Sequence, residues 1–328
     1  MNREQQAGGR LEKWGRLPII SGIKNNLGIL LSLLIMCILV TFISDSFFTV
    51  RNLFNILRQI SINVFLACSM TMVILTGGID LSVGSIIAVS GCLSAGLITL
   101  AGIPVIPAIL LSILAGVLVG VFNGFVISRT TIPAFIVTLA TMDIGRGFAR
   151  IYTKNTTILV SDPLYAEIGT GQVFGLPIHL FYIIVIILIS SLILNRTQFG
   201  RHLYAIGDNE TAANYAGINV RRVKFMVYMI SGIFAACAGI LSATRTFSAQ
   251  FSVGEGTEMD AISAVVLGGT SMMGGMGRLS GTIIGCVVIG VLDNGLNLLG
   301  IDSSWQYVVK GTVVLLAVFV DFLKKRKD

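Results

Sequence analysis

The chain carries little charge for its length. Only 12% of its 328 residues are charged, whereas 54% are hydrophobic. A soluble domain usually has about 25% charged residues, and a bilayer is the environment that accommodates so little charge over so long a chain. The composition therefore argues against soluble protein classes and predicts one membrane domain, residues 27–322.

Clusters typical of a metal site or a catalytic centre are also missing from the sequence. The five cysteines lie inside apolar segments and none pair at metal-binding spacing, so we interpret them as core residues. The two histidines, His179 and His202, stand alone. The sequence has no Gly-x-x-x-x-Gly-Lys-Ser/Thr phosphate loop. We therefore expect no metal and no enzymatic activity, and any ATP hydrolysis must come from another subunit.

Long apolar runs predict an all-α membrane protein with about ten spanning helices. The first run is longer than the apolar region of a signal peptide and no convincing cleavage site follows it, so we interpret it as an uncleaved span. The expected spans are 27–43, 56–77, 84–101, 106–127, 132–152, 178–194, 224–245, a short 259–271, 280–299 and 304–322.

The distribution of basic residues predicts the orientation of the chain. With the N-terminus inside, sixteen of the 23 Lys and Arg residues fall in inner segments and five in outer segments. Cytoplasmic loops of membrane proteins carry such an excess. Both termini, including the N-terminal segment 1–26 and the basic tail 323–328, are therefore expected in the cytoplasm. The same pattern accounts for the net charge of +7 without nucleic-acid binding.

Two glycine-rich interruptions lie between apolar runs. In one, Gly77-Gly78 precedes Asp80, and in the other Gly268-Gly269 precedes Thr270. Transporters often contain inverted repeats with helices broken at matching places, which makes two such repeats the expected architecture. Close helix packing through small residues would explain the glycines equally well. Asp80 either lines a wet cavity or caps the helix that starts near Ser82.

Four charged residues lie within expected spans, where charge is costly and is usually paired or functional. Asp143 and Arg146 are three residues apart on one helix and could pair on one face. Asp293 and Lys310 each lie about six residues, or roughly 9 Å, from the outer end of their spans, and could pair between adjacent helices. A structural pair and a role in the transport path are both open interpretations.

The longest inner loop, 195–223, contains a predicted short helix. Asp208 or Asn209 can cap its N-terminus, Glu210 favours its first turn, and Gly217 suits the position after its C-terminus. Small residues form one face of this helix: Ala212, Ala213 and Ala216. Such a helix could dock into a partner's groove, or it could be an ordinary capped loop helix.

Several short motifs follow one another along the chain. They are 77–85 (Gly-Gly-Ile-Asp-Leu-Ser-Val-Gly-Ser), Gly200-Arg201 through 217–220, 264–271, Gly274-Gly275, Gly277-Arg278, Gly281-Thr282 and 294–300. In this order they resemble the ribose-type sugar permeases of ABC importers. The resemblance extends from about residue 47 to the end, and 1–26 shows none. The run from Glu210 to Gly217 also looks like the Glu-Ala-Ala-type loop by which importer permeases contact their ATPases.

The resemblance implies a permease subunit of the bacterial cytoplasmic membrane that moves a monosaccharide, with a ribose-like pentose expected. An extracytoplasmic binding protein would deliver the sugar, and a second permease, most simply a copy of this chain, would complete the path. A separate ATPase would hold ATP and Mg²⁺. Because the binding protein sets most of the specificity in such systems, the permease sequence does not define which sugar is carried.

A gradient-driven carrier or a channel is the alternative to an importer, since such proteins also use broken helices. The loop 195–223 favours the importer.

The resemblance also implies roles for particular residues. The expected contacts to the ATPase are Gly200, Arg201, Asp208, Glu210, Ala212, Ala213 and Gly217. The expected path residues are Asp80, Ser82, Ser85, Asn123, Thr270, Ser271 and Asn294.

Overall fold

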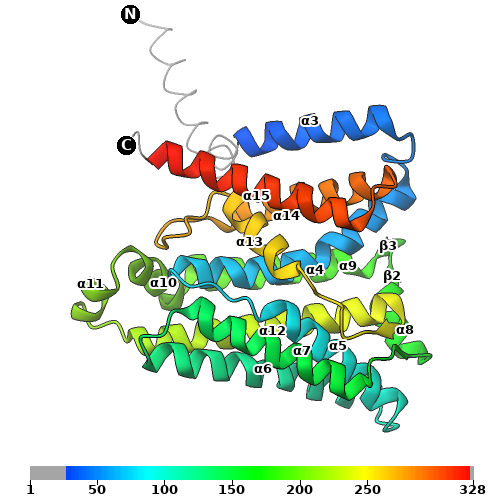
Figure 1. Ribbon diagram of the computed structural model, residues 1–328, viewed down its shortest axis with the longest axis horizontal. Coiled ribbons are helices and arrows are strands. Elements are labelled where there is room, and N and C mark those ends of the chain that lie inside the picture. Colours follow the sequence, from blue (N-terminus) through cyan, green and yellow to red (C-terminus); the bar gives the residue numbers. More distant parts are fainter. Residues whose placement is uncertain (1–26, 326–328) are drawn as a thin grey trace, which may run out of the picture.

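The computed structural model describes residues 27–325, which form a bundle made almost wholly of helices (Figure 1). The expected N-terminal segment 1–26 and the last three residues of the expected basic tail lie outside the described residues. The long helices are α3 (Leu27–Ile43), α4 (Val50–Leu75), α5 (Val83–Thr99), α6 (Val105–Arg129), α7 (Ala134–Thr153), α9 (Ile178–Arg196), α12 (Val220–Thr246), α14 (Leu279–Leu298) and α15 (Ser303–Lys325).

Shorter elements connect these helices. They are α8 (Pro163–Thr170), α10 (Gln198–Asp208), α11 (Glu210–Tyr215), α13 (Thr257–Leu267), and the two-residue strands β1 (Ile158–Leu159), β2 (Gln172–Val173), β3 (Leu176–Pro177) and β4 (Ser248–Ala249). Strand β1 pairs with β4, and β2 pairs with β3, both in antiparallel register. The sequence predicts none of these strands, because two-residue strands have no periodicity to read.

Within residues 27–325, five helices are long and apolar enough to cross a membrane: α4, α6, α9, α12 and α14. Residues 28–43 of α3 and the whole of α5 are shorter apolar helices. Helix α4 begins at Val50, six residues before the expected span, because the Thr49 side chain accepts a hydrogen bond from the Asn52 backbone and caps a polar first turn. The expected eighth span is α13, whose 11 residues extend only about 16 Å, roughly half of a bilayer.

Helix α12 lies at the centre and packs closely against α6. Three glycines four residues apart on α6 face the α12 backbone: a Cβ at Gly120 would overlap the Tyr228 carbonyl oxygen, and one at Gly124 would lie 2.6 Å from that of Phe225. On α12, Gly232 faces the backbone of Gly116 in the same way. Small residues at this spacing let two membrane helices approach backbone to backbone. The close approach of α6 and α12 places the backbones of the two helices in direct contact.

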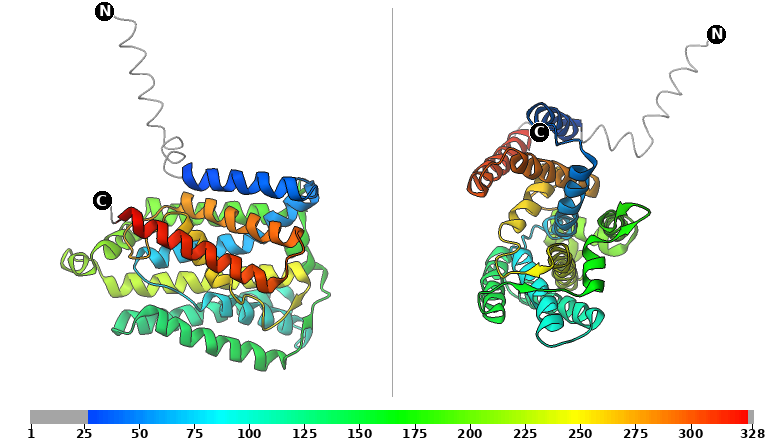
Figure 2. Two further views of the ribbon diagram at one scale, coloured as in Figure 1. Left: turned by 45° about the horizontal axis from the view of Figure 1, so that its top comes forward. Right: turned by 90° about the vertical axis from the view of Figure 1, so that its right-hand side faces the viewer.

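The two ends of the bundle differ. Helices α10 and α11, the start of α3 and the end of α15 lie at one end, and α8 with the β2–β3 hairpin lies at the other (Figure 1). The right panel of Figure 2 shows the bundle along its helices from the α8 end. Helices α3, α14 and α15 form one group, α5, α6 and α7 form another on the opposite side, and α4 and α13 lie between them. The short helix α13 therefore stands where the two groups meet.

Candidate functional site

Lys310 on α15 lies between two buried carboxylates. Its Nζ is 2.9 Å from Asp260 Oδ2 on α13 and 3.0 Å from Asp293 Oδ1 on α14. The structure thus brings together Asp293 and Lys310, which the sequence paired, and adds Asp260, which it did not. The signal for Asp260 was a lone carboxylate inside an expected apolar span, the same signal that singled out Asp293. One ammonium group therefore ties three helices together.

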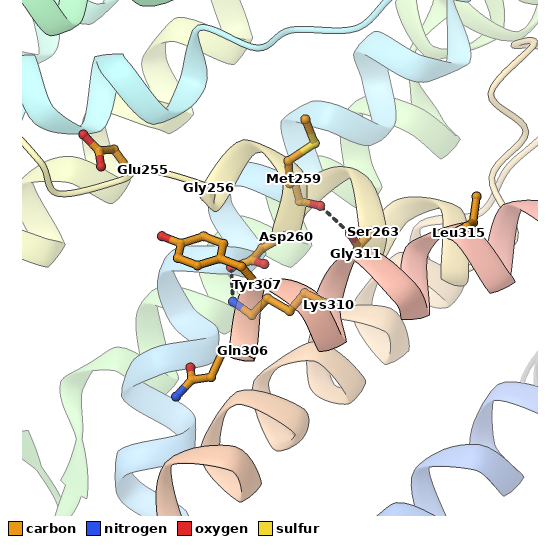
Figure 3. Close-up of a pocket in the computed structure, with 10 residues that line it drawn as sticks. All are labelled: Glu255, Gly256, Met259, Asp260, Ser263, Gln306, Tyr307, Lys310, Gly311 and Leu315. Atoms are coloured by element: carbon orange, nitrogen blue, oxygen red, sulfur yellow. Dashed lines mark hydrogen bonds and ion pairs between the residues drawn. The ribbon is translucent and has the colours of Figure 1, made fainter. Parts of the chain in front are cut away.

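A cavity of about 500 Å³ opens beside this ion cluster, between α13 and α15 (Figure 3). Tyr307 and Lys310 project from α15 toward α13, where Asp260 and Met259 lie. The ring of Tyr307 is largely open, since 59% of the residue surface is exposed. The cavity therefore combines an aromatic face with carboxylate, ammonium and amide groups.

A second cavity, of about 470 Å³, shares Glu255 and Gly256 with the first. Its wall on the α7 side contains Asp143, Arg146 and Arg150. The two cavities thus extend along one face of the bundle, formed by α7, the segment before α13, α13 itself and α15; we call it the charged face.

Asp143 and Arg146 do not form the expected ion pair in the described part of the chain. Arg146 Nη1 instead donates hydrogen bonds to the carbonyl oxygens of Phe251 (3.0 Å) and Val253 (2.6 Å). The arginine reaches these carbonyls because the segment before α13 is irregular and leaves them free to accept. Asp143 remains exposed at the tenth of the 20 residues of α7, halfway along the helix. A charge at that depth faces water or a partner rather than lipid.

Asp80 is completely buried and is held by three hydrogen bonds. Its Oδ1 accepts from the Ser82 backbone N (3.0 Å) and from Ser82 Oγ (2.6 Å), and its Oδ2 accepts from Ser231 Oγ on α12 (2.7 Å). Asn123 on α6 donates to Ser82 Oγ at 2.9 Å. Asp80 thus stabilises the turn before α5, whose N-cap is Ser82, and joins this turn to α6 and α12. The capping and the path interpretations of Asp80 both stay predictions.

The other expected path residues also lie inside the packed protein. Ser85 has no exposed surface and donates to the Ser82 carbonyl (2.8 Å), and Thr270 and Ser271 are almost fully buried. Asn294 forms a reciprocal amide pair with Asn52 of α4, at 2.9 and 2.8 Å. In this conformation the expected path residues form walls and helix ties, and the open polar surface lies on the charged face instead.

The two glycine-rich breaks meet at one point. The Gly275 backbone N donates to the Leu75 carbonyl at 3.0 Å. Gly207, at the end of α10, fills the remaining space, since a Cβ there would overlap both the Leu75 carbonyl oxygen and the Gly275 nitrogen. We call this three-way backbone contact, made by Leu75–Gly77, Gly207–Asp208 and Gly274–Gly275, the glycine junction. It places both breaks directly against the inner loop.

The inner loop 195–223 folds into two helices. Asn209 caps α11 by accepting from the Ala212 backbone N (2.9 Å), whereas Asp208 ends α10, so the cap is Asn209 of the two candidates. Gly217 follows α11 with φ +84°, as its expected position requires. Glu210 Oε2 lies 2.7 Å from Lys224 Nζ, which fixes α11 to the first turns of α12.

Helix α10 was not expected as a separate element. Its start is capped by Thr197, whose side chain accepts from the Gly200 backbone N at 3.1 Å. Tyr204 donates its hydroxyl to the Gly277 carbonyl (3.1 Å), and burial raises the pKa of Tyr204 and so preserves this donor. The helix is thereby fixed to the second glycine-rich break.

The exposed face of α11 differs from the expected one. Ala213 is only 5% exposed and packs on the body of the protein, and Gly200 is buried at the start of α10, so neither is presented to a partner. Arg201, Asp208, Glu210, Ala212 and Gly217 are exposed.

The sequence interpretation missed Tyr215, which is 87% exposed at the end of α11. Its signal was a lone aromatic residue in a short polar helix. Because tyrosine is enriched among the hot spots of protein interfaces, Tyr215 is a candidate contact for a partner.

These apolar helices, with an ion cluster buried between them, are typical of a multi-pass membrane protein. Residues 52–318 match the family described as branched-chain amino acid transport system / permease component, and the chain belongs to this family. It is a multi-pass protein of the bacterial inner membrane.

Three relatives and one solved structure place it more closely. The chain is 43% identical to the ribose import permease protein of Escherichia coli (strain K12), covering 90% of this chain and 93% of the relative. It is 46% identical to that of Bacillus subtilis (strain 168), covering 92% and 94%. It is 38% identical to the L-arabinose transport system permease protein of Escherichia coli (strain K12), covering 86% and 85%.

The solved structure is an inward-facing metal-chelate type ABC transporter. It is 16% identical, has a TM-score of 0.53, and covers 92% of this chain and 99% of that one. At this identity the likeness concerns the fold alone, which is that of an ABC transporter membrane subunit.

Proposed function

We propose that this chain is the permease subunit of an ATP-driven importer of a monosaccharide, most simply a ribose-like pentose. The observation that carries the proposal is the 43–46% identity to ribose import permeases over nine-tenths of the chain. The arabinose permease at 38% identity supports the broader class of pentose cargo. The protein itself is not an enzyme, and ATP and Mg²⁺ belong to a separate ATPase subunit.

Ten crossings with both termini in the cytoplasm are part of the proposal. The start of α3, the α10–α11 pair and the end of α15 lie at one end of the bundle, as this topology requires (Figure 1). The half-length helix α13 and the break that follows it together make the eighth crossing. The paired glycine-rich breaks, one in each half of the chain, support two inverted repeats.

The charged face is where we propose that a second permease, a copy of this chain, completes the path. Asp143 is exposed halfway along α7, and beside it lies a cavity that continues to Lys310. Lipid against this face would leave charges in hydrocarbon, whereas a facing copy encloses them in a wet space. The exposed apolar residues of α6 and α9 leave those helices to face lipid.

The ATPase is proposed to bind at α11. Tyr215 is the open anchor there, and a cleft of about 800 Å³ lies beside α11, lined by polar residues that include Arg129, Asn214 and Arg221. The extracytoplasmic binding protein is proposed to dock at the opposite end of the bundle, which carries α8 and the β2–β3 hairpin (Figure 1).

Purification of the tagged chain from cells that express the complete transport system tests this assignment. Native mass spectrometry should give two copies of the 35.0 kDa chain with two ATPase domains. Tyr215→Ala should lower the ATPase affinity by about 2 kcal/mol or more, as expected for truncating an aromatic anchor. The matched control is Tyr152→Ala, on α7 at the opposite end of the bundle, which should leave the ATPase bound. A chain that purifies without an ATPase contradicts the proposal.

A further inference from the structure

We propose that the cavity between α13 and α15 is a binding station for an uncharged sugar on the transport path. The inference rests on the proposed import function and assigns the residues that meet the cargo. Its wall is made by Asp260, Met259, Gln306, Tyr307 and Lys310 (Figure 3). The cavity volume of about 500 Å³ is within the range of small-molecule sites in proteins, which is roughly 300–1,000 Å³.

The polar groups of this wall retain unused hydrogen-bonding capacity. The Lys310 ammonium carries three N–H donors, of which two are directed at Asp260 and Asp293. Asp260 uses Oδ2 for Lys310, and its Oδ1 accepts no hydrogen bond from the described residues. One donor and one acceptor thus lie side by side, the combination that a sugar hydroxyl satisfies by accepting one hydrogen bond and donating another.

Gln306 adds a second acceptor in a fixed orientation. Its Nε2 donates to Asn297 Oδ1 (2.9 Å) and to the Ile301 carbonyl (3.1 Å). Both amide hydrogens are therefore occupied, and the Oε1 atom is left to accept. Because the two hydrogen bonds of Nε2 fix the amide group, the orientation of the Oε1 acceptor is set before a ligand binds.

Tyr307 and its neighbours supply the apolar part of the station. The Tyr307 ring lies open on the cavity wall, and Met259 and Leu315 line the same space. Sugars present C–H groups on the faces of the ring and hydroxyls around its edge, so an aromatic face next to clustered polar groups matches both parts. The lining as a whole is mostly apolar with a few convergent polar groups, as in ligand sites generally.

The balance of charge selects the class of ligand. The positive charge of Lys310 is opposed by the carboxylates of both Asp260 and Asp293, and Glu255 lies at the edge of the cavity. No cationic group of the described cavity wall is left to neutralise a phosphate or a carboxylate. A neutral polyol is therefore favoured over a sugar phosphate or an amino acid, whose carboxylate would face uncompensated negative charge.

Chemical labelling of an engineered cysteine in the complete complex tests the station. Met259→Cys places a thiol on the cavity wall, where the native residue is 55% exposed. Met276→Cys is the matched control, because Met276 is 60% exposed in the break after α13 and lies outside the cavity. The labelling rate by a hydrophilic thiol reagent is measured with D-ribose, with ribose 5-phosphate and without sugar, in nucleotide-free and vanadate-trapped complexes.

The proposal predicts that D-ribose slows labelling of Met259→Cys several-fold in at least one state, while ribose 5-phosphate does not and Met276→Cys is unaffected. A Met259→Cys thiol that stays unlabelled, or is labelled equally fast with ribose in both states, overturns the station. Equal protection by the phosphate overturns the assignment to neutral ligands. If the wild-type complex imports ribose with ATP while protection is absent, only the station fails and the proposed function stands.

A pair of substitutions at Tyr307 provides a readout that does not depend on cysteine chemistry. Tyr307→Phe keeps the aromatic face, whereas Tyr307→Leu removes it and retains an apolar side chain. Sugar uptake per ATP hydrolysed should fall about five-fold in Tyr307→Leu and stay near wild type in Tyr307→Phe, in line with the strength of aromatic contacts. Equal uptake by both variants, with normal complex assembly, contradicts the station.

Discussion

At the scale of single residues, Lys310 shows how this chain holds charge inside a membrane. One ammonium lies between two carboxylates and joins three helices that follow one another in the chain: α13, α14 and α15. Removing one member of a buried ion cluster leaves an uncompensated charge, which costs more than the cluster contributes when intact. Substitution of the shared cation is therefore expected to lower the free energy of unfolding more than substitution of one carboxylate.

Lys310→Met removes the shared cation and should lower the free energy of unfolding by about 3–5 kcal/mol. Asp260→Asn should cost less, since Lys310 keeps Asp293 as its ion partner and the asparagine oxygen can still accept. Thermal unfolding of the detergent-solubilised protein, followed by size-exclusion chromatography, measures both. Equal midpoints for the two variants would show that the cation is not the centre of the cluster.

Asp80 gives a second prediction at this scale. Asp80→Asn keeps an oxygen for Ser82, and the Ser231 hydroxyl can rotate to accept from the new amide, so transport and assembly should persist. Asp80→Ala leaves the Ser82 and Ser231 donors buried without an acceptor and should destabilise the protein by about 2–3 kcal/mol. Uptake assays and thermal unfolding separate the two roles. Loss of uptake by a well-folded Asp80→Asn would instead place the carboxylate on the path.

Residue chemistry was predictable from the sequence where the partner is local and less so where it is distant. The bonds between Asp80 and Ser82 are local, since the two residues are two positions apart, but the bond to Ser231 requires the packing of α12 against the first break. Asp143 and Arg146 are close enough in sequence to pair. Arg146 instead donates hydrogen bonds to backbone carbonyls of a distant segment, the one before α13. Local spacing says which contacts are feasible, and the fold decides among them.

At the scale of elements, the glycine junction connects the end of the bundle with α10 and α11 to the two glycine-rich breaks. Gly207 at the end of α10 contacts the breaks that precede α5 and follow α13. Helix α13 in turn carries Asp260 of the ion cluster. A displacement of α10 and α11 therefore reaches both breaks through direct backbone contact.

Gly207→Ala tests this connection. The added Cβ overlaps the Leu75 carbonyl oxygen and the Gly275 nitrogen, so the junction must open, at a cost of about 1–3 kcal/mol. The variant should still bind the ATPase at α11 but lose the stimulation of ATP hydrolysis by the sugar-loaded binding protein. Gly28→Ala is the control, since nothing lies within 4 Å of a Cβ there. Full stimulation in Gly207→Ala would rule out the junction as the connection.

Elements were predictable where length and apolarity define them. The long apolar runs gave α6, α9 and α14 within a few residues, and the cap and glycine signals gave α11. Helices α8 and α10 were not expected, because their amphipathic character is masked by the loops that contain them. Their N-cap residues, Asp162 and Thr197, are visible in the sequence, but no long apolar run follows either of them. A cap residue without such a run does not predict a helix.

At the scale of the whole molecule, the surfaces of the described chain fit the proposed role of a permease subunit that works with a separate ATPase. Helices α10 and α11 lie at one end of the bundle, and α8 with the β2–β3 hairpin lies at the other (Figures 1 and 2). The charged face is formed by α7, the segment before α13, α13 itself and α15. Each of these surfaces is incomplete alone: Tyr215 is open, and Asp143 is exposed at mid-depth. The unit that we propose for transport is therefore an assembly of two permease copies, an ATPase and a binding protein.

Uptake of radiolabelled D-ribose into vesicles reconstituted with the purified complex tests this account most directly. Uptake should require ATP on the side of α11 and the sugar-loaded binding protein on the side of α8, and a protonophore should leave it unchanged. Uptake that continues without ATP and collapses with the protonophore would contradict the account and identify a gradient-driven carrier.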